Sequence, residues 1–218
     1  MKKKKIICFI PIKKFSERLK SKNFRIIGGK PLYKHVIEKV IKTKKFHKIV
    51  IDTDSKEIQN FCKLKKINYL ERLDHLKSNK ANGNDLLKYW LKIEPNFDYY
   101  FQLHVTSPLI KTQTIKKCVI ELLKNKKINS IFTAVKEYSW YWFKNKPVNF
   151  PKYKLQRSQT LNPIIRDITF LYGISKKEFL KRNSRIGSKP HPYFVKDEEA
   201  IDINEDFDLK LAKNFLEK

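Results

Sequence analysis

The sequence has few of the residues that characterise several common classes of protein. Its 218 residues include only 5 glycines, 3 cysteines and 1 methionine. No run of about 18 apolar residues is present, so we expect no membrane-spanning helix. The apolar run at residues 6–12, which follows the lysines at the start of the sequence, is too short for a signal peptide. Cys8, Cys62 and Cys118 lie far apart in apolar stretches, which is typical of reduced buried thiols and favours a cytoplasmic location.

Histidine and acidic residues are also scarce. The histidines show no paired spacing, so we expect no zinc site; they are His35, His47, His75, His104 and His191. Lysine and arginine number 49 against 22 acidic residues, which gives a net charge of +27. Such a charge is typical of nucleic-acid or anionic-surface binding. The lysines are spread over nearly every segment instead of forming one stripe, so we attribute most of them to solvated faces and only local clusters to anionic substrates.

Hydrophobic periodicity predicts alternating strands and helices. Short apolar β-prone runs occur at residues 5–12, 48–52, 67–70, 99–104, 130–135 and 169–174. Helical spacing occurs at residues 31–44, from Ser55, and at 84–93, 113–124, from Lys176 and 206–217. This order predicts one doubly wound α/β domain over residues 1–218, a mostly parallel Rossmann-like sheet in three layers, with ligands at the carboxyl ends of its strands.

Residues 136–165 break this alternation. The segment is rich in aromatic residues and proline, among them Trp140, Trp142, Phe143 and Tyr153. It is too apolar for a free loop and too irregular for a helix, so we expect it to pack onto another surface. A subunit interface is the leading interpretation, and a lid or arm on its own domain is the alternative.

The loop behind the first strand carries the first candidate site residues. Lys13, Ser16, Arg18 and Lys22 follow Pro11 within twelve residues. A loop that follows a strand and carries several cations and a hydroxyl can surround a triphosphate, and lysine binds phosphate well because its charge is compact. The loop lacks the glycines of a Walker loop or a dinucleotide fingerprint, and a solvated basic loop is the alternative.

Four segments in order resemble the acylneuraminate cytidylyltransferases, the CMP-sialic acid synthetases. The opening loop with residues 22–32 (KNFRIIGGKPL) is similar to the family's I-P-A-R-x-G-S-K-x-x-x-x-K-N start and following G-G/K-K-P-L. Residues 51–58 (IDTDSKEI) resemble its second strand and turn, and residues 102–109 (QLHVTSPL) its L-Q-P-T-S-P-L segment. Residues 201–209 (IDINEDFDL) resemble its closing D-I-D-T-x-x-D-L. Each motif is weak alone, but their order along the whole chain is a specific signal.

The resemblance implies a sugar nucleotidyltransferase that moves CMP from CTP to the anomeric hydroxyl of an acidic, sialic-acid-like sugar, for cell-surface polysaccharide. It places Lys13 at the family's arginine position and Lys22 on the phosphates, and with Asp202 these are the expected catalytic residues. We expect the nucleotide to contact Lys13, Ser16, Arg18, Lys22, Asn23, Arg72 and Asn82, and the sugar to contact Gln102, Tyr172 and Arg166. The resemblance also implies a homodimer in which the aromatic segment of one subunit reaches the other's sugar pocket.

A magnesium ion is the expected cofactor, with Asp202 and Asn204 as its protein ligands. Nucleotidyl transfer needs neutralised phosphate oxygens, which cations and a hard metal supply. Mg²⁺ needs few protein carboxylates, because substrate oxygens and water complete its octahedron. Asp202 could instead be a cap or turn residue before the last helix.

The chain departs from the family at three places. Asn204 stands where a second aspartate is usual, although its amide oxygen can coordinate and Asp206 or Asp208 could compensate. Phe15 stands where the phosphate loop often has a small residue. Residues 166–173 (RDITFLYG) replace an N-G-A-I-Y-type strand, so the sugar-pocket asparagine is absent and the identity of the sugar stays open.

Two other functions remain as alternatives. A basic nucleic-acid-binding protein would explain the charge and the aromatic segment but not the ordered motifs. A catalytically impaired nucleotide-binding paralogue would explain Asn204 and Phe15. The related 3-deoxy-manno-octulosonate cytidylyltransferases place an aspartate after the central strand, where this chain has residues 102–108, which favours the acylneuraminate branch. We interpret Asp52 and Asp54 as a strand-end turn outside the active site, and His104 as a strand-end residue beside the pocket.

Overall fold

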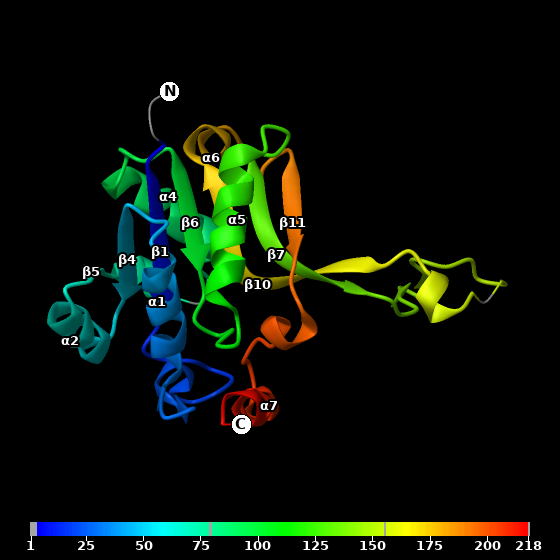
Figure 1. The fold of residues 1–218 in the computed structure, drawn as a ribbon, viewed down its shortest axis with the longest axis horizontal. Helices are drawn as coiled ribbons and strands as arrows, with labels where there is room; N and C mark the ends of the chain where they lie inside the picture. The colour runs from blue at the N-terminus through cyan, green and yellow to red at the C-terminus, as the bar shows by residue number, and fades with distance from the viewer. Residues whose placement is uncertain (1–3, 79, 155, 218) are drawn as a thin grey trace.

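A seven-stranded mixed sheet with helices on both faces forms the body of the protein (Figure 1). The computed structural model describes residues 4–78, 80–154 and 156–217. The strand order is β11-β7-β10-β6-β1-β4-β5. Among the described residues β10 alone runs antiparallel to its neighbours, and the other six strands of this sheet share one direction. The predicted three-layer α/β fold is confirmed.

Most elements lie close to the predicted ranges, although β10 is longer and neither α3 nor β11 was predicted. The strands of the main sheet are β1 (Ile6–Ile12), β4 (Lys48–Thr53), β5 (Asn68–Glu71), β6 (Tyr99–Leu103), β7 (Ser130–Glu137), β10 (Ile164–Ser175) and β11 (Pro190–Phe194). The helices are α1 (Leu32–Thr43), α2 (Lys56–Lys65), α3 (Asp74–Lys77), α4 (Gly83–Ile93), α5 (Thr112–Lys124), α6 (Lys176–Arg182) and α7 (Asp206–Leu216). Two short hairpins complete the fold, formed by β2 (Ile26–Ile27) with β3 (Lys30–Pro31) and by β8 (Trp142–Phe143) with β9 (Lys146–Pro147).

The alternation of side chains along β1 builds two separate cores. Cys8 and Ile10 face the side covered by α1, α2 and α5, while Ile7 and Phe9 face the side covered by α4 and α6. Because successive side chains of a strand point to opposite faces, a central strand with helices on both sides is apolar throughout. A third, smaller cluster joins the loop after β1 to α7 through Leu19, Ile203 and other side chains.

Side-chain caps fix where α4 and α6, which cover one face of the sheet, begin. Asn82 accepts hydrogen bonds from the backbone N–H groups of Asn84 and Asp85, and the Asp85 carboxylate accepts from the Asn82 N–H, which makes a capping box at the start of α4. Ser175 caps α6 in the same way, by accepting from the Glu178 N–H. The α4 helix therefore begins at Gly83, which places its first turn at the carboxyl ends of the strands.

The sheet differs from the sequence-based expectation at its β11 edge. The strand expected at residues 169–174 is longer, antiparallel and bulged between Asp167 and Tyr172, and Thr169 adopts a φ of 54°. The strand β11 was not predicted; it pairs parallel to β7 and carries two prolines, which remove backbone donors and suit an edge position.

The aromatic segment projects from the body as an arm (Figure 1). The outer parts of β7 and β10 pair with each other beyond the rest of the sheet, and the chain between them forms the β8–β9 hairpin and a short 3-10 helix, Ser158–Thr160. The arm points away from the domain and does not fold over it. Most of its aromatic side chains are exposed, with Phe143 66% and Tyr153 92% accessible, while Tyr141 and Phe150 are partly buried.

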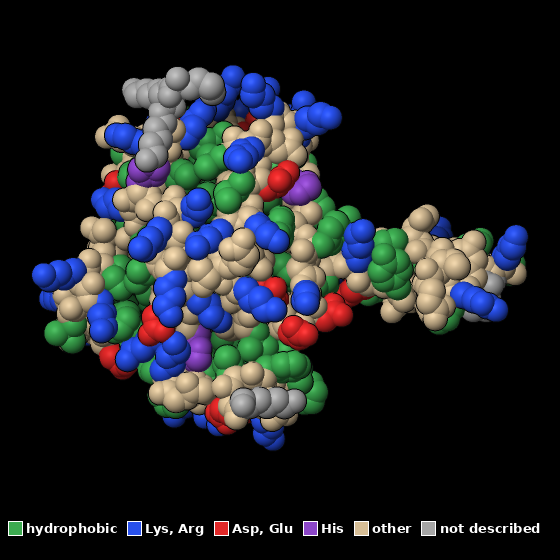
Figure 2. All heavy atoms as spheres, viewed as in Figure 1, with side chains coloured by type: hydrophobic (Ala, Val, Ile, Leu, Met, Phe, Trp, Pro, Cys, Tyr) green, Lys and Arg blue, Asp and Glu red, His purple; other side chains and the backbone are tan. Residues whose placement is uncertain are grey.

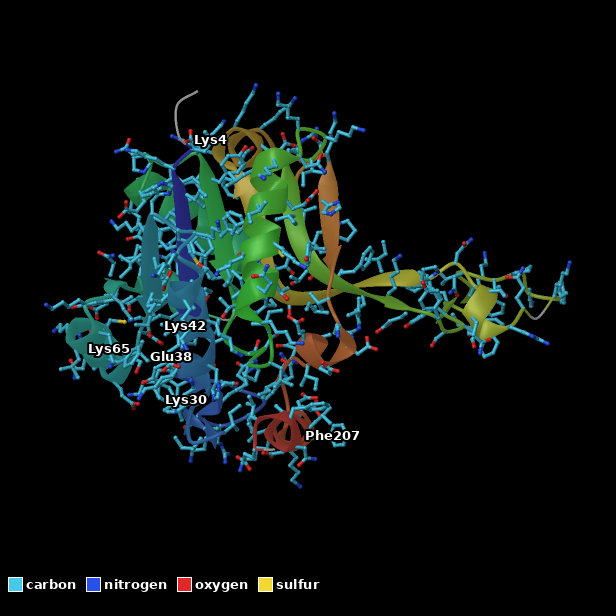
Figure 3. All side chains as sticks on the ribbon, in the orientation of Figure 1. Lys4, Lys30, Glu38, Lys42, Lys65 and Phe207 are labelled. Carbon is cyan, nitrogen blue, oxygen red and sulfur yellow. The ribbon has the colours of Figure 1, made fainter. Side chains whose placement is uncertain are left out.

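The positive charge is distributed over the surface. Figure 2 shows Lys and Arg side chains scattered across the visible face and onto the arm. Lys4, Lys30, Lys42 and Lys65, labelled in Figure 3, lie on different parts of the body. No helix of the described residues has the length and apolar character needed to cross a membrane.

Candidate active site

The carboxyl ends of β1 and β6 open into a cleft of about 340 Å³. From β1 the chain proceeds to β4 and β5 on one side and then returns to β6 on the other, so the cleft lies at the topological switch point of the sheet, where open α/β sheets bind ligands. All seven residues expected to bind the nucleotide line it: Lys13, Ser16, Arg18, Lys22, Asn23, Arg72 and Asn82. A larger hollow of about 570 Å³ lies at the amino-terminal end of the strands, beside Lys4 and Ile6, and contains none of the expected site residues.

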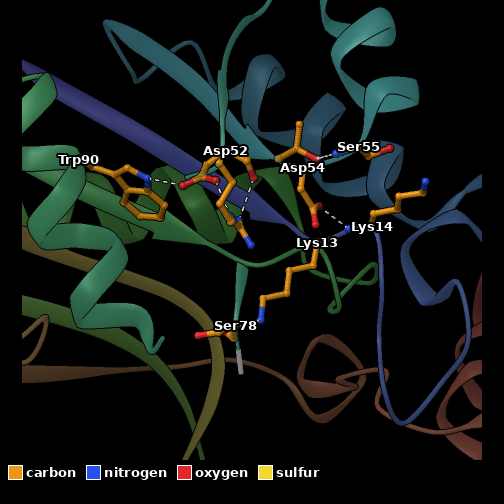
Figure 4. Close-up of polar contacts among 9 residues, drawn as sticks. Lys13, Lys14, Asp52, Asp54, Ser55, Ser78 and Trp90 are labelled. Carbon is orange, nitrogen blue, oxygen red and sulfur yellow. Dashed lines mark hydrogen bonds and ion pairs between the residues drawn. The ribbon is translucent and has the colours of Figure 1, made fainter. Parts of the chain in front are cut away.

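Hydrogen bonds from distant segments shape the basic loop after β1. The Asp54 carboxylate accepts a 2.6 Å hydrogen bond from the Lys14 N–H (Figure 4). Asn23 donates its amide to the Lys13 carbonyl at 2.8 Å, and the Lys13 ammonium donates to the Ser78 carbonyl at 3.1 Å. The turn at residues 52–54, interpreted from sequence as lying outside the active site, therefore positions the start of this loop.

Lys22 is buried at the wall of the cleft. Its ammonium donates a 2.8 Å hydrogen bond to the Ile203 carbonyl. Desolvation lowers the pKa of Lys22, and the charge of Arg18 lowers it further, while Asp202 and Asp208 act in the opposite direction. The Lys22 ammonium forms no ion pair with a carboxylate of the described residues. Such a buried ammonium gains most from an incoming phosphate, because the phosphate replaces the lost hydration.

Arg18 joins the loop to the segment before α7. Its guanidinium donates a 2.7 Å hydrogen bond to the Asn204 side-chain oxygen. The Asn204 amide nitrogen in turn donates to Asp202 Oδ2 at 2.8 Å. The residues expected to hold phosphate and those expected to hold metal are therefore in direct contact.

Asp202 fits a metal ligand better than Asn204 does. Asp202 Oδ1 is buried without a hydrogen-bond partner, whereas the oxygen of Asn204 is bonded to Arg18. Asp208 is occupied by the N–H groups of Asn204 and Glu205, which it caps at the start of α7, and Asp206 is exposed. No group of three or more metal-binding side chains occurs among the described residues. One free carboxylate oxygen suits a Mg²⁺ whose other ligands come from substrate and water.

Asp52 holds the cleft residue Arg72 in place, and Figure 4 shows the Asp52 carboxylate next to Trp90. Asp52 Oδ1 accepts from Arg72 Nε at 2.6 Å, and its backbone carbonyl accepts from Nη2 at 2.9 Å. Asp52 Oδ2 accepts from Trp90 Nε1 at 2.6 Å, and the Trp90 ring stacks on Phe9 with ring centroids 4.5 Å apart. The pair is fully buried, so the guanidinium is fixed in one orientation. Sequence reasoning did not assign Asp52 this positioning role.

Gln102 lies in β6, and His104 is the first residue after this strand. His104 lines the cleft, whereas Gln102 does not. The side-chain oxygen of Gln102 accepts a 3.1 Å hydrogen bond from Arg185. Counted back from Thr106-Ser107-Pro108, the glutamine of the L-Q-P-T-S-P-L pattern falls on His104. Burial lowers the pKa of His104 to about 3, with smaller contributions from the charges of Arg185, Arg72 and Lys22, so the imidazole is neutral near pH 7.

Unpartnered polar atoms concentrate around this site. Six buried side-chain atoms of the described residues have no hydrogen-bond partner, and only one of them, on Gln59, belongs to a helix away from the cleft. The other five are Asn23 Oδ1, Gln102 Nε2, His104 Nε2, Ser107 Oγ and Asp202 Oδ1. Buried polar groups are nearly always hydrogen-bonded in folded proteins, so this concentration is typical of a site that a polar ligand completes.

Comparison with known proteins identifies the family. The family model described as cytidylyltransferase matches residues 7–210. The chain belongs to the cytidylyltransferase family. It is 25% identical to the N-acylneuraminate cytidylyltransferase of Escherichia coli O18:K1:H7 over 98% of this chain and 52% of that protein. It is 26% identical to the CMP-N,N'-diacetyllegionaminic acid synthase of Legionella pneumophila over 98% of this chain and 97% of that protein.

The fold agrees with this family. The solved structure of a CMP:2-keto-3-deoxy-manno-octonic acid synthetase complexed with CTP superimposes with a TM-score of 0.71, 15% identity and 98% coverage of both chains. The chain spans about half the length of several curated N-acylneuraminate cytidylyltransferases that it matches.

Two of the expected sugar-binding residues of this cytidylyltransferase have local partners instead of facing the cleft. Arg166 forms an ion pair with Glu137 at the base of the arm, and Glu137 also accepts from the Tyr141 hydroxyl. Arg166 borders a neighbouring hollow of about 500 Å³ together with Asp202. The Tyr172 hydroxyl donates to Asp167 at 2.8 Å, and burial raises the pKa of Tyr172.

Sequence reasoning missed one charged residue of the site. Arg185 lies in the loop after α6, and its guanidinium lies 3.5 Å from the centre of the Tyr172 ring. Neither periodicity nor any motif in the cytidylyltransferase pattern marks residue 185. Only the fold brings this loop against β6 and the start of α4.

Proposed function

We propose that this protein transfers CMP from CTP to the anomeric hydroxyl of an acidic nonulosonic sugar and releases pyrophosphate. The single observation that carries the proposal is the convergence of all seven expected nucleotide-binding residues on one cleft at the switch point of the sheet. The names of the relatives, N-acylneuraminate cytidylyltransferase and CMP-N,N'-diacetyllegionaminic acid synthase, support an acidic sugar as acceptor.

The basic groups of the cleft would bind the triphosphate and stabilise the leaving pyrophosphate. Lys13, Arg18 and Lys22 all line the cleft. Fixed cations that do not need to reorganise stabilise the charge that develops on the bridging oxygen during transfer. Arg72, immobilised by Asp52, presents the rest of its guanidinium to the nucleotide.

Asp202 would hold a magnesium ion together with substrate oxygens. Its Oδ1 is buried and unpartnered, which is the donor chemistry that Mg²⁺ prefers. When bound, the ion would neutralise phosphate charge and lower the pKa of the attacking hydroxyl. Asn204 would orient the Asp202 carboxylate through its amide nitrogen. Arg18 would move from Asn204 to the triphosphate when CTP enters, because a charged acceptor forms the stronger hydrogen bond.

We propose that the protein acts as a cytoplasmic homodimer held by its arm. Tyr138, Trp140, Trp142, Phe143 and Val148 form an exposed apolar surface on the arm, from 43% to 66% accessible. Exposed apolar surface of this kind is typical of an interface. A symmetric partner is the most common way for such a patch to be buried.

The proposed activity is tested by pyrophosphate release from each of the four nucleoside triphosphates with Mg²⁺ and a panel of nonulosonic acids that includes N-acetylneuraminate and N,N'-diacetyllegionaminate. We expect release to require CTP and one acid. Asp202→Asn should reduce the rate by about 100-fold or more, because it removes the carboxylate that holds the metal. Asp98→Asn is the matched control, because Asp98 is exposed at the opposite end of the sheet.

Two outcomes would contradict the proposal. Binding of CTP without release across the panel would identify a catalytically impaired paralogue. Salt-dependent binding of RNA or DNA without any preference for CTP would identify a nucleic-acid-binding protein.

A further inference from the structure

Arg185 is a partly buried cation beside the cleft. No carboxylate of the described residues forms an ion pair with its guanidinium. Arg72 and Arg166, by contrast, pair with Asp52 and Glu137. The charge of Asp167 acts on Arg185, but the Tyr172 hydroxyl and the Thr169 N–H donate hydrogen bonds to the two oxygens of Asp167.

Neutral groups hold the Arg185 guanidinium in a fixed position. Its face stacks on the Tyr172 ring at 3.5 Å, and Nη1 donates to Gln102 Oε1 at 3.1 Å. The backbone N–H of Arg185 donates to the Asn84 side chain at 2.8 Å, which fastens the loop to the first turn of α4. A stacked and hydrogen-bonded guanidinium leaves its remaining N–H groups in a preset plane, which matches a carboxylate.

Gly83 allows the guanidinium to reach the wall of the cleft. Gly83 lines the cleft as the first residue of α4. A Cβ atom added at this position would lie 2.3 Å from Arg185 Nη1 and 3.1 Å from Gln102 Oε1. The absence of a side chain is therefore what lets Arg185 and Gln102 meet behind the cleft.

The surroundings of Arg185 favour an anion. Burial lowers the pKa of Arg185, while the charges of Tyr172 and Asp167 act in the opposite direction without a direct ion pair. The buried Gln102 Nε2, 1% exposed as a residue, has no partner among the described residues and is a further donor beside the same guanidinium. A free amide donor next to a guanidinium that forms no ion pair with a described carboxylate makes an anion-binding arrangement.

We propose that Arg185 binds the carboxylate of the acidic acceptor, with Gln102 Nε2 as the second donor, and so determines the preference for an acidic over a neutral sugar. This inference rests on the proposed function, because it assumes that the acceptor enters the cleft on the side of Tyr172. From the sequence, Arg166 was the arginine expected to bind the sugar. In the structure Arg166 pairs with Glu137, whereas Arg185 forms no ion pair with a carboxylate of the described residues, so the inference assigns this role to Arg185.

The test compares each acid with its own C1 amide. The probes are N-acetylneuraminate and N,N'-diacetyllegionaminate and the two corresponding amides, measured by pyrophosphate release and, with CMP in place of CTP, by calorimetric titration. Arg185→Gln should raise the KM for the acid about 10- to 100-fold, the loss expected for a hydrogen bond to a charged group. It should leave the amide nearly unaffected and change the KM for CTP by less than about twofold.

Two further variants separate position from charge. Gly83→Ala keeps every charge but displaces the end of the Arg185 side chain, so it should reproduce the loss of acid preference while the protein remains folded. Arg182→Gln is the matched control, because Arg182 lies on the surface of α6 and pairs with Glu178 at 3.5 Å. This control should keep the wild-type preference for the acid.

The outcomes distinguish this inference from the proposed function. Acid binding that depends on Arg185 supports the inference even where no pyrophosphate is released, and in that case only the proposed function fails. Pyrophosphate release with equal losses for acid and amide in Arg185→Gln, or wild-type protein that binds acid and amide equally, would overturn the inference.

Discussion

Replacement of Asp52 by asparagine tests whether the buried network beneath the cleft holds Arg72 as described. Asp52 receives 2.6 Å hydrogen bonds from both Arg72 Nε and Trp90 Nε1, and the Arg72 and Asp52 side chains are each 1% exposed. Asparagine has one oxygen for these two donors, and its NH₂ group must face the other. The substitution also leaves the guanidinium charge buried without compensation.

The expected loss of stability is large. Removal of one partner of a buried ion pair costs roughly 3–5 kcal/mol, and asparagine, which keeps one acceptor, should lie near about 3 kcal/mol. For a domain of this size about 3 kcal/mol corresponds to a melting temperature lower by roughly 6–12 °C. Urea unfolding followed by Trp90 fluorescence measures the change in the free energy of unfolding.

Asp74→Asn provides the matched control. Asp74 pairs with Lys77 at 2.5 Å, but the Asp74 side chain is 95% exposed, so water replaces the lost interaction and no measurable change is expected. A second variant that replaces the whole pair, Asp52→Asn with Arg72→Met, should recover part of the lost stability because it removes the uncompensated charge. Equal urea midpoints for Asp52→Asn and Asp74→Asn would refute the reasoning.

Two further predictions concern His104 and the arm. The folded protein protonates His104 only near pH 3, whereas the unfolded chain does so near 6.5, so stability is lost as the pH falls below about 6.5. Between pH 7 and 5 the wild type should therefore lose roughly 2 kcal/mol more than His104→Gln in urea titrations, and equal losses would contradict the buried neutral imidazole. For the arm, light scattering should give the wild type twice the 26.2 kDa mass of one chain. The double variant Trp142→Asp with Phe143→Asp should have the mass of a single chain. Leu64→Asp, which changes an exposed residue of α2, is the control and should keep the double mass. A wild-type protein of single mass at working concentration would contradict the dimer.

Most of the fold was predictable because its elements carry local signals. Residues 6–12 are apolar throughout and become a strand buried on both faces. The helix expected at residues 31–44 begins after Pro31 and ends where Lys44 turns left-handed. In both regions the periodicity of the sequence and the tertiary packing agree, which is the condition under which sequence reasoning succeeds.

The unpredicted features depend on contacts between distant segments. The strand β11 contains Pro190 and Pro192 and pairs only because it lies beside β7, fifty to sixty residues earlier in the chain. In the sequence Asp52 resembles a turn residue, and only the fold shows that it accepts hydrogen bonds from Arg72 and Trp90. The role of Arg185 depends on Tyr172, Gln102 and Gly83, which belong to three different elements. Local propensity contains no information on such contacts.

The continuity of β10 would couple the proposed dimer to the proposed selection of the acceptor sugar. Its first residues form one side of the arm, where Ile164 and Ile165 pair with the end of β7. After the bulge the same strand carries Tyr172, on which Arg185 stacks. In the proposed dimer, a partner subunit packed on the arm would restrain the same backbone that carries Tyr172. Dissociation of that dimer should weaken the discrimination between sugars before it weakens the binding of the nucleotide, which we assign to the loop after β1.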